Sequence, residues 1–569
     1  MSDESFPFRR KIGRERRYNG REHTTDSFAH GFTSNIKSAH GRIRRGEHRP
    51  SNILFLIETR SLPAFARSYP RRVTFHVTPF FLYPSSFSLF ERHSFRRESE
   101  RQIMNDKPHV NVTLRAIKLI RKSKMKFTTT CIALAGAAII VVASARPQSA
   151  TAAAAEPTSQ PRQIGIDSAN RLFEAGKFAE AGKLYSQIVA KNSKDYSATL
   201  QLGRIALLCN RLDDAQKWFE KAIALKADEA DPKVLLAQAF YRRDDFQKAA
   251  AALNGVDVSS NKLVIDQYPT LNAAMFESFK GQMPYELKGN GASTRVKFVK
   301  TDPLPLLNVR INGGKEVTFF IDTGGSVVTL DTEFAKELGV PQFGGVQGTF
   351  SGGQHTEVKL GRIESLTVGD WTVKNLPTAM MPLRQLSEGF GVKQIDGVIG
   401  TTLFYHFLTT MDYPHGELVL RRKDAKSLEE FKKSPGKRVT VPIWMAGDHF
   451  MVGWGRVETV PPTLLFVDTG LMGAGVKLAE SVIKEAGIKL EENKATQGAG
   501  GGGTLKIVPY TVRQVSLGDI KEENVQGVYD GPFPWENMFG FHLAGMVGHE
   551  FFKPYAVTFD FQNMQIFLQ

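Results

Sequence analysis

The stretch Phe320–Ser326 reads FIDTGGS, and the stretch Phe466–Met472 reads FVDTGLM. Each places an Asp-Thr-Gly triplet directly after an apolar run. One such triplet is weak evidence, because average residue usage produces it by chance in about one chain in ten of this length. Two copies in similar surroundings predict a duplicated unit, provided that the neighbouring segments repeat as well.

Three neighbouring segments do repeat, in the same order and with offsets of 148 to 150 residues. Asp396–Leu420 aligns with Ala544–Leu568, Val368–Leu376 with Leu517–Val525, and Gln347–Gly353 with Gln497–Gly503. Four matched blocks with nearly constant spacing indicate an internal duplication. We therefore predict two lobes, at residues 285–425 and 438–569.

The texture of both lobes predicts an all-β fold. Short apolar runs alternate with turn signals, and Asn312-Gly313 between two such runs is a hairpin signature. Helices are sparse in this region. The clearest expected helices are TEFAKELGV after the first triplet and LAESVIKEAGI after the second.

Residues 164–262 have a helical texture with a period of 34 residues. Aligned at this period, two sets of bulky residues coincide, namely Phe178, Leu212 and Phe246, and Tyr185, Phe219 and Leu253. One set of small residues coincides between them, namely Ala181, Ala215 and Ala249. Small residues let paired helices approach closely, and bulky ones fill the space between hairpins. The segment resembles three tetratricopeptide repeats, although Ser193 and Ala227 replace the usual closing proline. That resemblance implies a protein partner docked on the helices; a helical spacer without a ligand is the alternative.

The duplicated β unit resembles the aspartic peptidases, specifically the retropepsin-like group, with both lobes in one chain. Each half has a strand, Asp-Thr-Gly, a Gly-rich segment, and an apolar-apolar-Gly segment, here GVIG and GMVG. The resemblance implies an all-β bilobal fold behind the helical repeats, a peptide or protein substrate in a cleft between the lobes, and hydrolysis without a cofactor. Two carboxyl groups close together share one proton, so that one can activate water while the other polarises the scissile carbonyl.

The predicted site follows from this resemblance. Asp322 and Asp468 are the candidate catalytic pair, and Thr323 and Thr469 are expected to cross-link the two loops through hydroxyl to backbone bonds. Gly324 and Gly470 let the backbone turn beside the carboxylates. Phe350–His355 and Gly498–Thr504 are candidate flaps, which close over an extended peptide. Their candidate substrate-binding residues are Ser351, Gly352, Gly353, Gly500, Gly501 and Gly502.

The second copy departs from the pattern. A small residue usually follows the triplet, as Gly325 does, whereas the second copy has Leu471 and then Met472. A bulky Leu471 is expected to distort the loop or narrow the cleft. Two alternatives to an endopeptidase therefore stay open: a degenerate lobe pair that binds peptides without cutting them, and a scaffold in which only the helical repeats matter.

The N-terminal part has a different character. Residues 1–124 contain 26 Lys and Arg against 11 Asp and Glu, which accounts for 15 of the 16 net positive charges of the chain. The basic residues follow no helical or strand period, which predicts a disordered leader or upstream sequence read in frame rather than a nucleic-acid-binding fold. We expect translation to start at Met125 or Met104; a genuine basic arm is the alternative.

Residues 125–145 have the form of a secretory signal. A basic start precedes an apolar stretch from Cys131 to Ala143, and the segment ends in Ala143-Ser144-Ala145. The apolar stretch is short for a membrane span, so export to the periplasm or the extracellular space is expected rather than anchoring by an uncleaved signal. Residues 146–163 read as a linker. Cys209 is then the one cysteine of the exported part, which excludes an internal disulfide there.

Other motifs carry less. GAGGGG has the glycines of a dinucleotide-binding loop, but a β-like segment follows instead of a helix. HEFFK at His549–Lys553 lacks the second histidine of a zinc helix, and we predict no metal site. Asp412 and Asp560 hold equivalent places before the last strand of each lobe and are expected to be structural. Four tryptophans are expected mainly in the core: Trp371, Trp444, Trp454 and Trp535.

Overall fold

The computed structural model describes residues 165–569. The predicted leader (1–124), signal (125–145) and linker (146–163) lie outside the described residues. Within residues 165–569, no helix combines the length and the apolar character that a membrane span requires.

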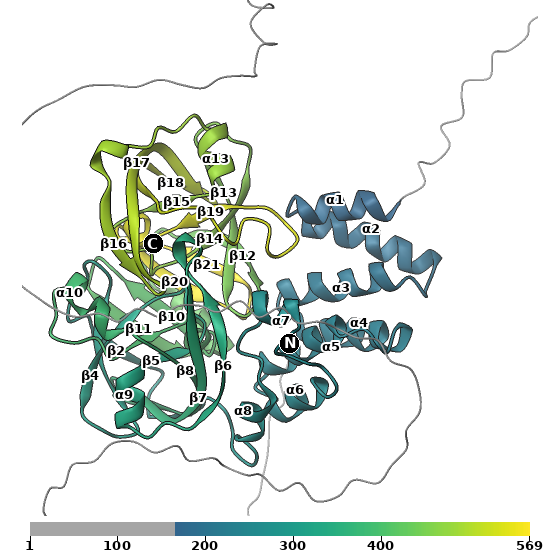
Figure 1. The fold of residues 1–569 in the computed structure, drawn as a ribbon, viewed down its shortest axis with the longest axis horizontal. Helices are drawn as coiled ribbons and strands as arrows, with labels where there is room; N and C mark the ends of the chain where they lie inside the picture. Colours follow the sequence, from purple (N-terminus) through teal and green to yellow (C-terminus); the bar gives the residue numbers. More distant parts are fainter. Residues whose placement is uncertain (1–164) are drawn as a thin grey trace, which may run out of the picture. The chain divides into compact units, whose positions relative to one another are not determined.

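The first part of the described chain consists of helical hairpins (Figure 1). Its helices are α1 (Ile166–Glu174), α2 (Phe178–Lys191), α3 (Tyr196–Leu208), α4 (Leu212–Leu225), α5 (Asp231–Tyr241), α6 (Phe246–Ala252), α7 (Lys262–Gln267) and α8 (Ala273–Glu277). The three alanines that the 34-residue period aligned are fully buried. Helices α1 to α6 form the predicted hairpins, and α7 and α8 continue the helical region beyond residue 262.

Lobe 1 is built on one sheet, with the order β1-β8-β5-β9-β4-β3-β7-β6. Its strands are β1 (Glu286–Lys288), β3 (Leu306–Ile311), β4 (Glu316–Ile321), β5 (Val328–Asp331), β6 (Gln342–Thr349), β7 (His355–Val368), β8 (Trp371–Met381) and β9 (Gly397–Ile399). The β3–β4 hairpin turns at Asn312 and Gly313, whose φ values of 52° and 69° confirm the predicted Asn-Gly turn. Short helices α9 (Thr332–Glu337), α10 (Ser387–Phe390) and α11 (Thr401–Phe404) complete the lobe.

Lobe 2 repeats this plan. Its strands are β13 (Phe450–Val457), β14 (Thr463–Val467), β15 (Val476–Leu478), β16 (Thr496–Gly500), β17 (Gly503–Leu517), β18 (Ile520–Tyr529) and β19 (Leu543–Val547), with helices α13 (Glu480–Glu485) and α14 (His549–Phe552). Both expected helices, α9 and α13, are present. In lobe 1, β4 pairs in parallel with β9 and β5 with β8; in lobe 2, β14 pairs in parallel with β19 and β15 with β18. The two lobes therefore share the same strand pairing, as the duplicated sequence predicts.

A shared sheet joins the lobes. Its strands are β2 (Ser293–Lys297), β11 (Glu417–Arg422), β10 (Phe407–Asp412), β20 (Ala556–Asp560), β21 (Gln565–Leu568) and β12 (Val439–Ala446), hydrogen-bonded in that order. Helix α12 (Ala425–Lys433) follows β11. At the centre of the shared sheet, Thr410 of β10 pairs with Thr558 of β20, and their hydroxyls lie 2.7 Å apart. These residues are 148 apart, so the pseudo-twofold relation between the lobes passes between equivalent strands.

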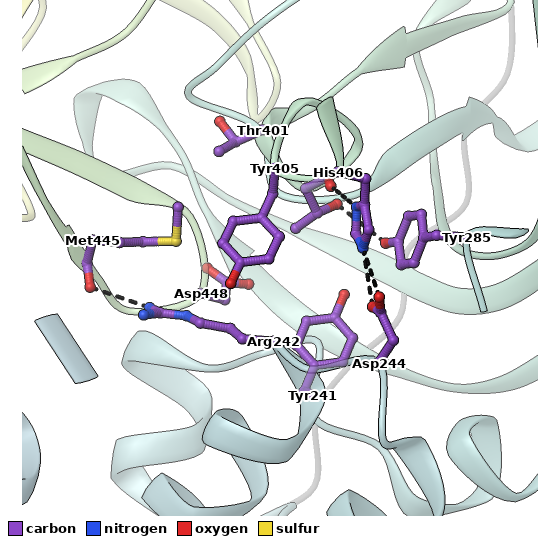
Figure 2. A pocket seen from close by; sticks show the side chains of 10 residues that line it. Tyr241, Arg242, Asp244, Tyr285, Thr401, Tyr405, His406, Met445 and Asp448 are labelled. Carbon is purple, nitrogen blue, oxygen red and sulfur yellow. Dashed lines mark hydrogen bonds and ion pairs between the residues drawn. The ribbon is translucent and has the colours of Figure 1, made fainter. Parts of the chain in front are cut away.

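The helical region packs directly on the lobes. Phe178 lies edge-to-face with Trp444 of β12, with ring centroids 5.5 Å apart. Buried Arg242, after α5, donates to the carbonyls of Leu207 (2.8 Å), Met445 (3.1 Å) and Gly447 (2.7 Å). Figure 2 shows Arg242 reaching Met445. One edge of the helical region is therefore already occupied by this chain's own β domain.

Replacing Arg242 tests this junction. The Arg242→Met change leaves buried carbonyls without their charged donor, so the free energy of unfolding should fall by roughly 2–4 kcal/mol. Chemical denaturation measures it. The matched control is Arg211→Met, because Arg211 is 57 % exposed and pairs only with Asp214; it should stay within about 0.5 kcal/mol. Equal effects in the two variants would contradict the account of the junction.

Candidate active site

The structure brings Asp322 and Asp468 together from the two lobes. Asp322 follows β4 and Asp468 follows β14, at the same place in the duplicated plan. A methyl group on Gly324 would come within 2.6 Å of Asp468 Oδ1, and one on Gly470 within 2.1 Å of Asp322 Oδ1. Each glycine thus lies against the carboxyl group of the opposite lobe. A side chain at either position would push the two loops apart.

Thr323 and Thr469 cross-link the loops reciprocally. The Thr323 amide donates to Thr469 Oγ1 (3.1 Å), and the Thr469 amide donates to Thr323 Oγ1 (2.9 Å). The Thr323 hydroxyl in turn donates to the carbonyl of Val467 at 3.1 Å. Both threonines are fully buried. These are the hydroxyl to backbone bonds that the resemblance implied.

With Leu471 in place, the second loop keeps the bond between its glycine amide and its aspartate. The Gly470 amide donates to Asp468 Oδ1 at 2.8 Å, as the Gly324 amide does to Asp322 Oδ1 at 2.7 Å. The Leu471 side chain packs against Gly548, where an added methyl group would lie 2.7 Å from Leu471 Cβ. Gly548 therefore leaves room for Leu471. The loop is slightly looser than its counterpart, because the Leu471 amide lies 3.4 Å from the Asp468 carbonyl, whereas the Gly325 amide lies 3.1 Å from the Asp322 carbonyl.

Burial and proximity shift the titration of the pair. Burial raises the pKa of Asp322, against the hydrogen bond from Asp468 and the positive charge of His449. Burial also raises the pKa of Asp468 well above its ordinary value, and the negative charge of Asp322 adds to this rise. Two carboxyl groups this close cannot both ionise cheaply. The arrangement favours one proton shared by the pair.

The two predicted flaps contact each other. Each is the tip of a hairpin, β6–β7 in lobe 1 and β16–β17 in lobe 2. Gln354 Nε2 donates to the carbonyl of Thr504 at 2.7 Å, and a methyl group on Gly501 would lie 2.3 Å from the Phe350 ring. Gly352 lies against Asp530, and Gly502 against Gln354, whereas a methyl group added to Gly353 or Gly500 would extend into open space. The flap residues predicted from the glycine pattern thus occupy one cross-lobe contact.

Lys477 is a site residue that the sequence reasoning missed. It is fully buried on β15, forms an ion pair with Asp530, and donates to Ser351 Oγ at 2.7 Å. Burial lowers its pKa, and its charge acts on Asp468. Lys477 therefore holds the first flap against lobe 2. A lysine inside the otherwise apolar Val476–Leu478 strand was the available signal.

Asp412 and Asp560 lie in turns. Asp560 accepts from the amides of Gln562 (3.2 Å) and Asn563 (3.1 Å), and Asp412 accepts from the amide of His415 at 3.1 Å. Trp371 is buried in lobe 1 and donates to the carbonyl of Asn290 at 2.9 Å. These contacts are those of structural residues.

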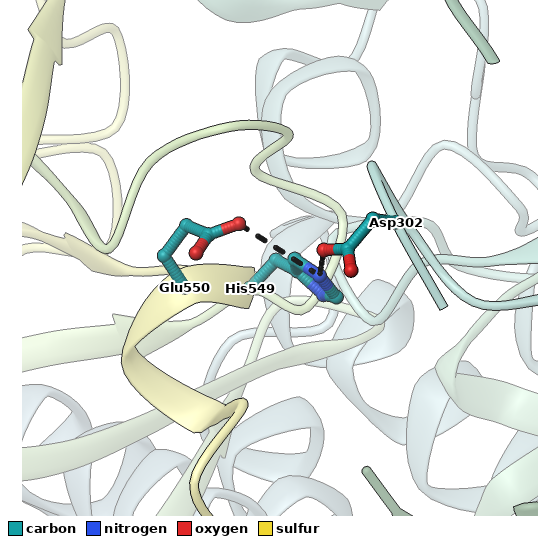
Figure 3. A group of neighbouring side chains, drawn as sticks. All are labelled: Asp302, His549 and Glu550. Atoms are coloured by element: carbon teal, nitrogen blue, oxygen red, sulfur yellow. Dashed lines mark hydrogen bonds and ion pairs between the residues drawn. The ribbon is translucent and has the colours of Figure 1, made fainter. Parts of the chain in front are cut away.

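One group of side chains within residues 165–569 has the donor types of a metal site. Ligand atoms of Asp302, His549 and Glu550 lie within 4.8 Å of one another (Figure 3). However, Lys553 Nζ lies 2.7 Å from Asp302 Oδ1 and 3.2 Å from Glu550 Oε2. The ammonium group stands where a cation would be needed, so the group forms an ion-pair cluster that ties lobe 1 to α14.

Comparisons with known proteins agree with this architecture. Residues 307–403 and 455–530 match the aspartyl protease family, and residues 172–224 match a tetratricopeptide repeat. The chain thus carries a retropepsin-like aspartyl protease domain in two segments, one in each lobe, with tetratricopeptide repeats upstream. A search of curated proteins finds no match.

Two crystal structures of the Yersinia enterocolitica type III secretion chaperone SycD are similar to a small part of the chain. One, in complex with a peptide of the translocator YopD, has 17 % identity over 16 % of this chain and 70 % of that chain, with a TM-score of 0.16. The other, an alternative dimer, has 18 % identity over 16 % and 69 %, again with a TM-score of 0.16.

The threonine cross-link has a testable cost. In Thr323→Val the isosteric side chain strands the buried Thr469 amide and Val467 carbonyl, so unfolding free energy should drop by roughly 1–3 kcal/mol. The control is Thr409→Val, since Thr409 is fully buried but its hydroxyl has no partner within the described part of the chain. That change should be neutral or slightly stabilising. A neutral Thr323→Val would show that the cross-link does not hold the lobes together.

Asp468→Asn should stabilise the fold at neutral pH. Because the folded-state pKa of Asp468 is raised, the folded chain binds more protons than the unfolded one above the ordinary aspartate pKa of about 3.9, and stability falls as the pH rises. Asparagine removes this loss. The Tm of the variant should exceed that of the wild type near about pH 7 and converge with it near about pH 3.

The control for this titration is Asp228→Asn at an exposed position, whose Tm difference from the wild type should not depend on pH. A lower Tm for Asp468→Asn than for the wild type at neutral pH would contradict the raised pKa.

Proposed function

We propose that the protein is an aspartic endopeptidase that hydrolyses peptide bonds with a water molecule activated between Asp322 and Asp468. The observation that carries the proposal is the convergence of these carboxyl groups from equivalent loops, each against the other lobe's glycine. The family match over both segments supports the same reading.

The chemistry uses the two protonation states of the pair. Ionised Asp322 accepts a proton from water, and protonated Asp468 donates a hydrogen bond to the scissile carbonyl while water attacks its carbon. The tetrahedral intermediate collapses when Asp322 gives the proton it took from water to the leaving nitrogen and the C–N bond breaks. The proton on the oxygen of the intermediate returns to Asp468, which restores the pair. No covalent intermediate with the chain is formed. The flaps over the site exclude bulk water, which strengthens these interactions.

The bonds that the second loop keeps around Asp468 favour catalysis over binding alone. In a degenerate lobe pair the Asp468 loop would lack the bonds of its counterpart, whereas the Gly470 amide here keeps its bond to Asp468. The reciprocal threonine bonds hold both aspartate loops in place in the same way. Burying two carboxyl groups this close together lowers the stability of the fold. A catalytic role in which the pair shares a proton explains why the arrangement is present.

The helical region is proposed to dock a protein partner or substrate on the surface that the β lobes leave free. Its hairpins present solvent-exposed side chains on α2 and α4, away from the Arg242 junction. Export is part of the same proposal and rests on residues 125–145 alone. The substrate is then a peptide or protein met outside the cytoplasm.

Turnover of a quenched peptide library or casein tests the proposal. Asp322→Asn and Asp468→Asn should each lower kcat by about 10³-fold or more, because each removes one half of the acid–base pair. The wild-type profile of kcat/KM against pH should be bell-shaped. Its upper limb should fall as the raised Asp468 pKa is passed, so activity should extend above the ordinary carboxyl range.

Asp412→Asn is the matched control, because Asp412 lies in a turn outside the catalytic loops and is the lobe 1 counterpart of Asp560. This variant should keep wild-type kcat. A pepstatin-like inhibitor should abolish turnover. Full activity in either Asp322→Asn or Asp468→Asn would refute the pair.

A further inference from the structure

His449 lies beside the first catalytic loop and is not part of the duplicated pattern. It sits in the turn between β12 and β13, is 8 % exposed, and its Nε2 lies 2.8 Å from the carbonyl oxygen of Gly324. Its Nδ1 is hydrogen-bonded to Asp448. A carbonyl and a carboxylate both accept hydrogen bonds. The ring therefore bridges the Gly324 carbonyl and the Asp448 carboxyl group.

Asp448 is held in turn by the helical region. Its backbone amide donates to the carbonyl of Gln267 at 3.0 Å, and Thr270 Oγ1 donates to Asp448 Oδ2 at 3.3 Å. Gly447 has φ +56°, and a methyl group there would lie 2.8 Å from the Gln267 carbonyl oxygen. Arg242 clamps the same turn through the Met445 and Gly447 carbonyls. The 447–449 turn thus connects helices to a catalytic loop.

The contact breaks the symmetry of two otherwise matched loops. Within residues 165–569 no hydrogen bond reaches the Gly470 carbonyl, which is the counterpart of Gly324. The lobe 1 segment that corresponds to the 447–449 turn carries Asp302, which bonds to His549 and Lys553 instead. The lobe 1 loop accepts a bond from His449, whereas the charge that acts on Asp468 in the lobe 2 loop is that of Lys477. Closeness alone leaves one proton on the pair, and a difference of this kind biases which carboxyl group is ionised.

We propose that His449 is a positioning residue of the proposed peptidase: it fixes the Asp322 loop through the Gly324 carbonyl and places a positive charge beside Asp322, while Asp448 and the helical region hold it there. The inference rests on the proposed function and deepens it. It makes the helical region a structural part of the active site as well as a docking element.

The charges around His449 support this role. Asp448 faces it from its own turn, and Asp322 faces it from the loop after β4. On the helical side Arg242 and Tyr268 lie near Asp448. The Phe450 and Phe466 rings pack beside the imidazole, with centroids 4.3 Å and 6.4 Å away. The His449 charge lowers the pKa of Asp322 and so opposes the effect of burial.

Two variants of the full chain separate geometry from charge. His449→Gln keeps an amide donor for the Gly324 carbonyl but no charge, and His449→Phe keeps neither. We expect His449→Phe to lower kcat by about 10- to 100-fold with KM within about twofold, since one charged hydrogen bond is lost. His449→Gln should recover most of this loss. In both variants the acidic limb of the pH profile should move to higher pH, because Asp322 loses its neighbouring cation.

The control is His415→Gln, because His415 is 75 % exposed and pairs with Asp412 in a turn; its kcat and acidic limb should match the wild type. A purely structural role would lower Tm in the His449 variants and leave the acidic limb in place. Wild-type kcat and an unmoved acidic limb in both variants would overturn the proposal.

A second readout does not depend on turnover. Carboxyl-labelled aspartate NMR can follow the titration of Asp322, assigned by its loss in Asp322→Asn. The midpoint should rise in both His449 variants and stay fixed in His415→Gln; an unmoved midpoint contradicts the inference. Absence of wild-type turnover would count against the proposed peptidase function, and the titration would still decide whether His449 acts on Asp322.

Discussion

Two reciprocal hydrogen bonds between Thr323 and Thr469 hold the candidate site together. Each threonine closes the loop of the other lobe, so neither loop has its final geometry alone. The cross-link brings Asp322 against Gly470 and Asp468 against Gly324. Only glycine leaves room for this approach. The duplication is therefore a requirement of the chemistry, because one lobe supplies one carboxyl group and half of the bonds that position it.

The rest of the molecule builds outward from this contact. The shared sheet carries the pseudo-twofold relation through Thr410 and Thr558, and the flaps contact each other through Gln354 and Thr504. Departures from symmetry concentrate near the carboxyl groups. Lys477 of lobe 2 binds the first flap. His449 bonds to the carbonyl of Gly324 and not to that of its counterpart Gly470. The pair is thus matched in backbone and unequal in charge.

The sequence predicted what is local and repeated. The triplets, both flaps, helices α9 and α13, and the helical hairpins each have a signal within a few residues. The sequence predicts a distortion at Leu471 because it does not show how closely the side chain packs on Gly548, 77 positions away. Lys477 had a local signal in its apolar strand. His449 had none, since its role depends on a contact 125 residues distant and on support from helices that a single sequence does not place.

The central claim is that Asp322 and Asp468 act as one proton-sharing unit. Peptide turnover by the two single Asn variants and the double variant, measured at the wild-type pH optimum, tests it most directly. The account predicts the same residual rate in all three, because residues that act as a unit are strongly non-additive. If the fold-loss of the double variant equalled the product of the two single fold-losses, the two groups would act independently, which would contradict the claim.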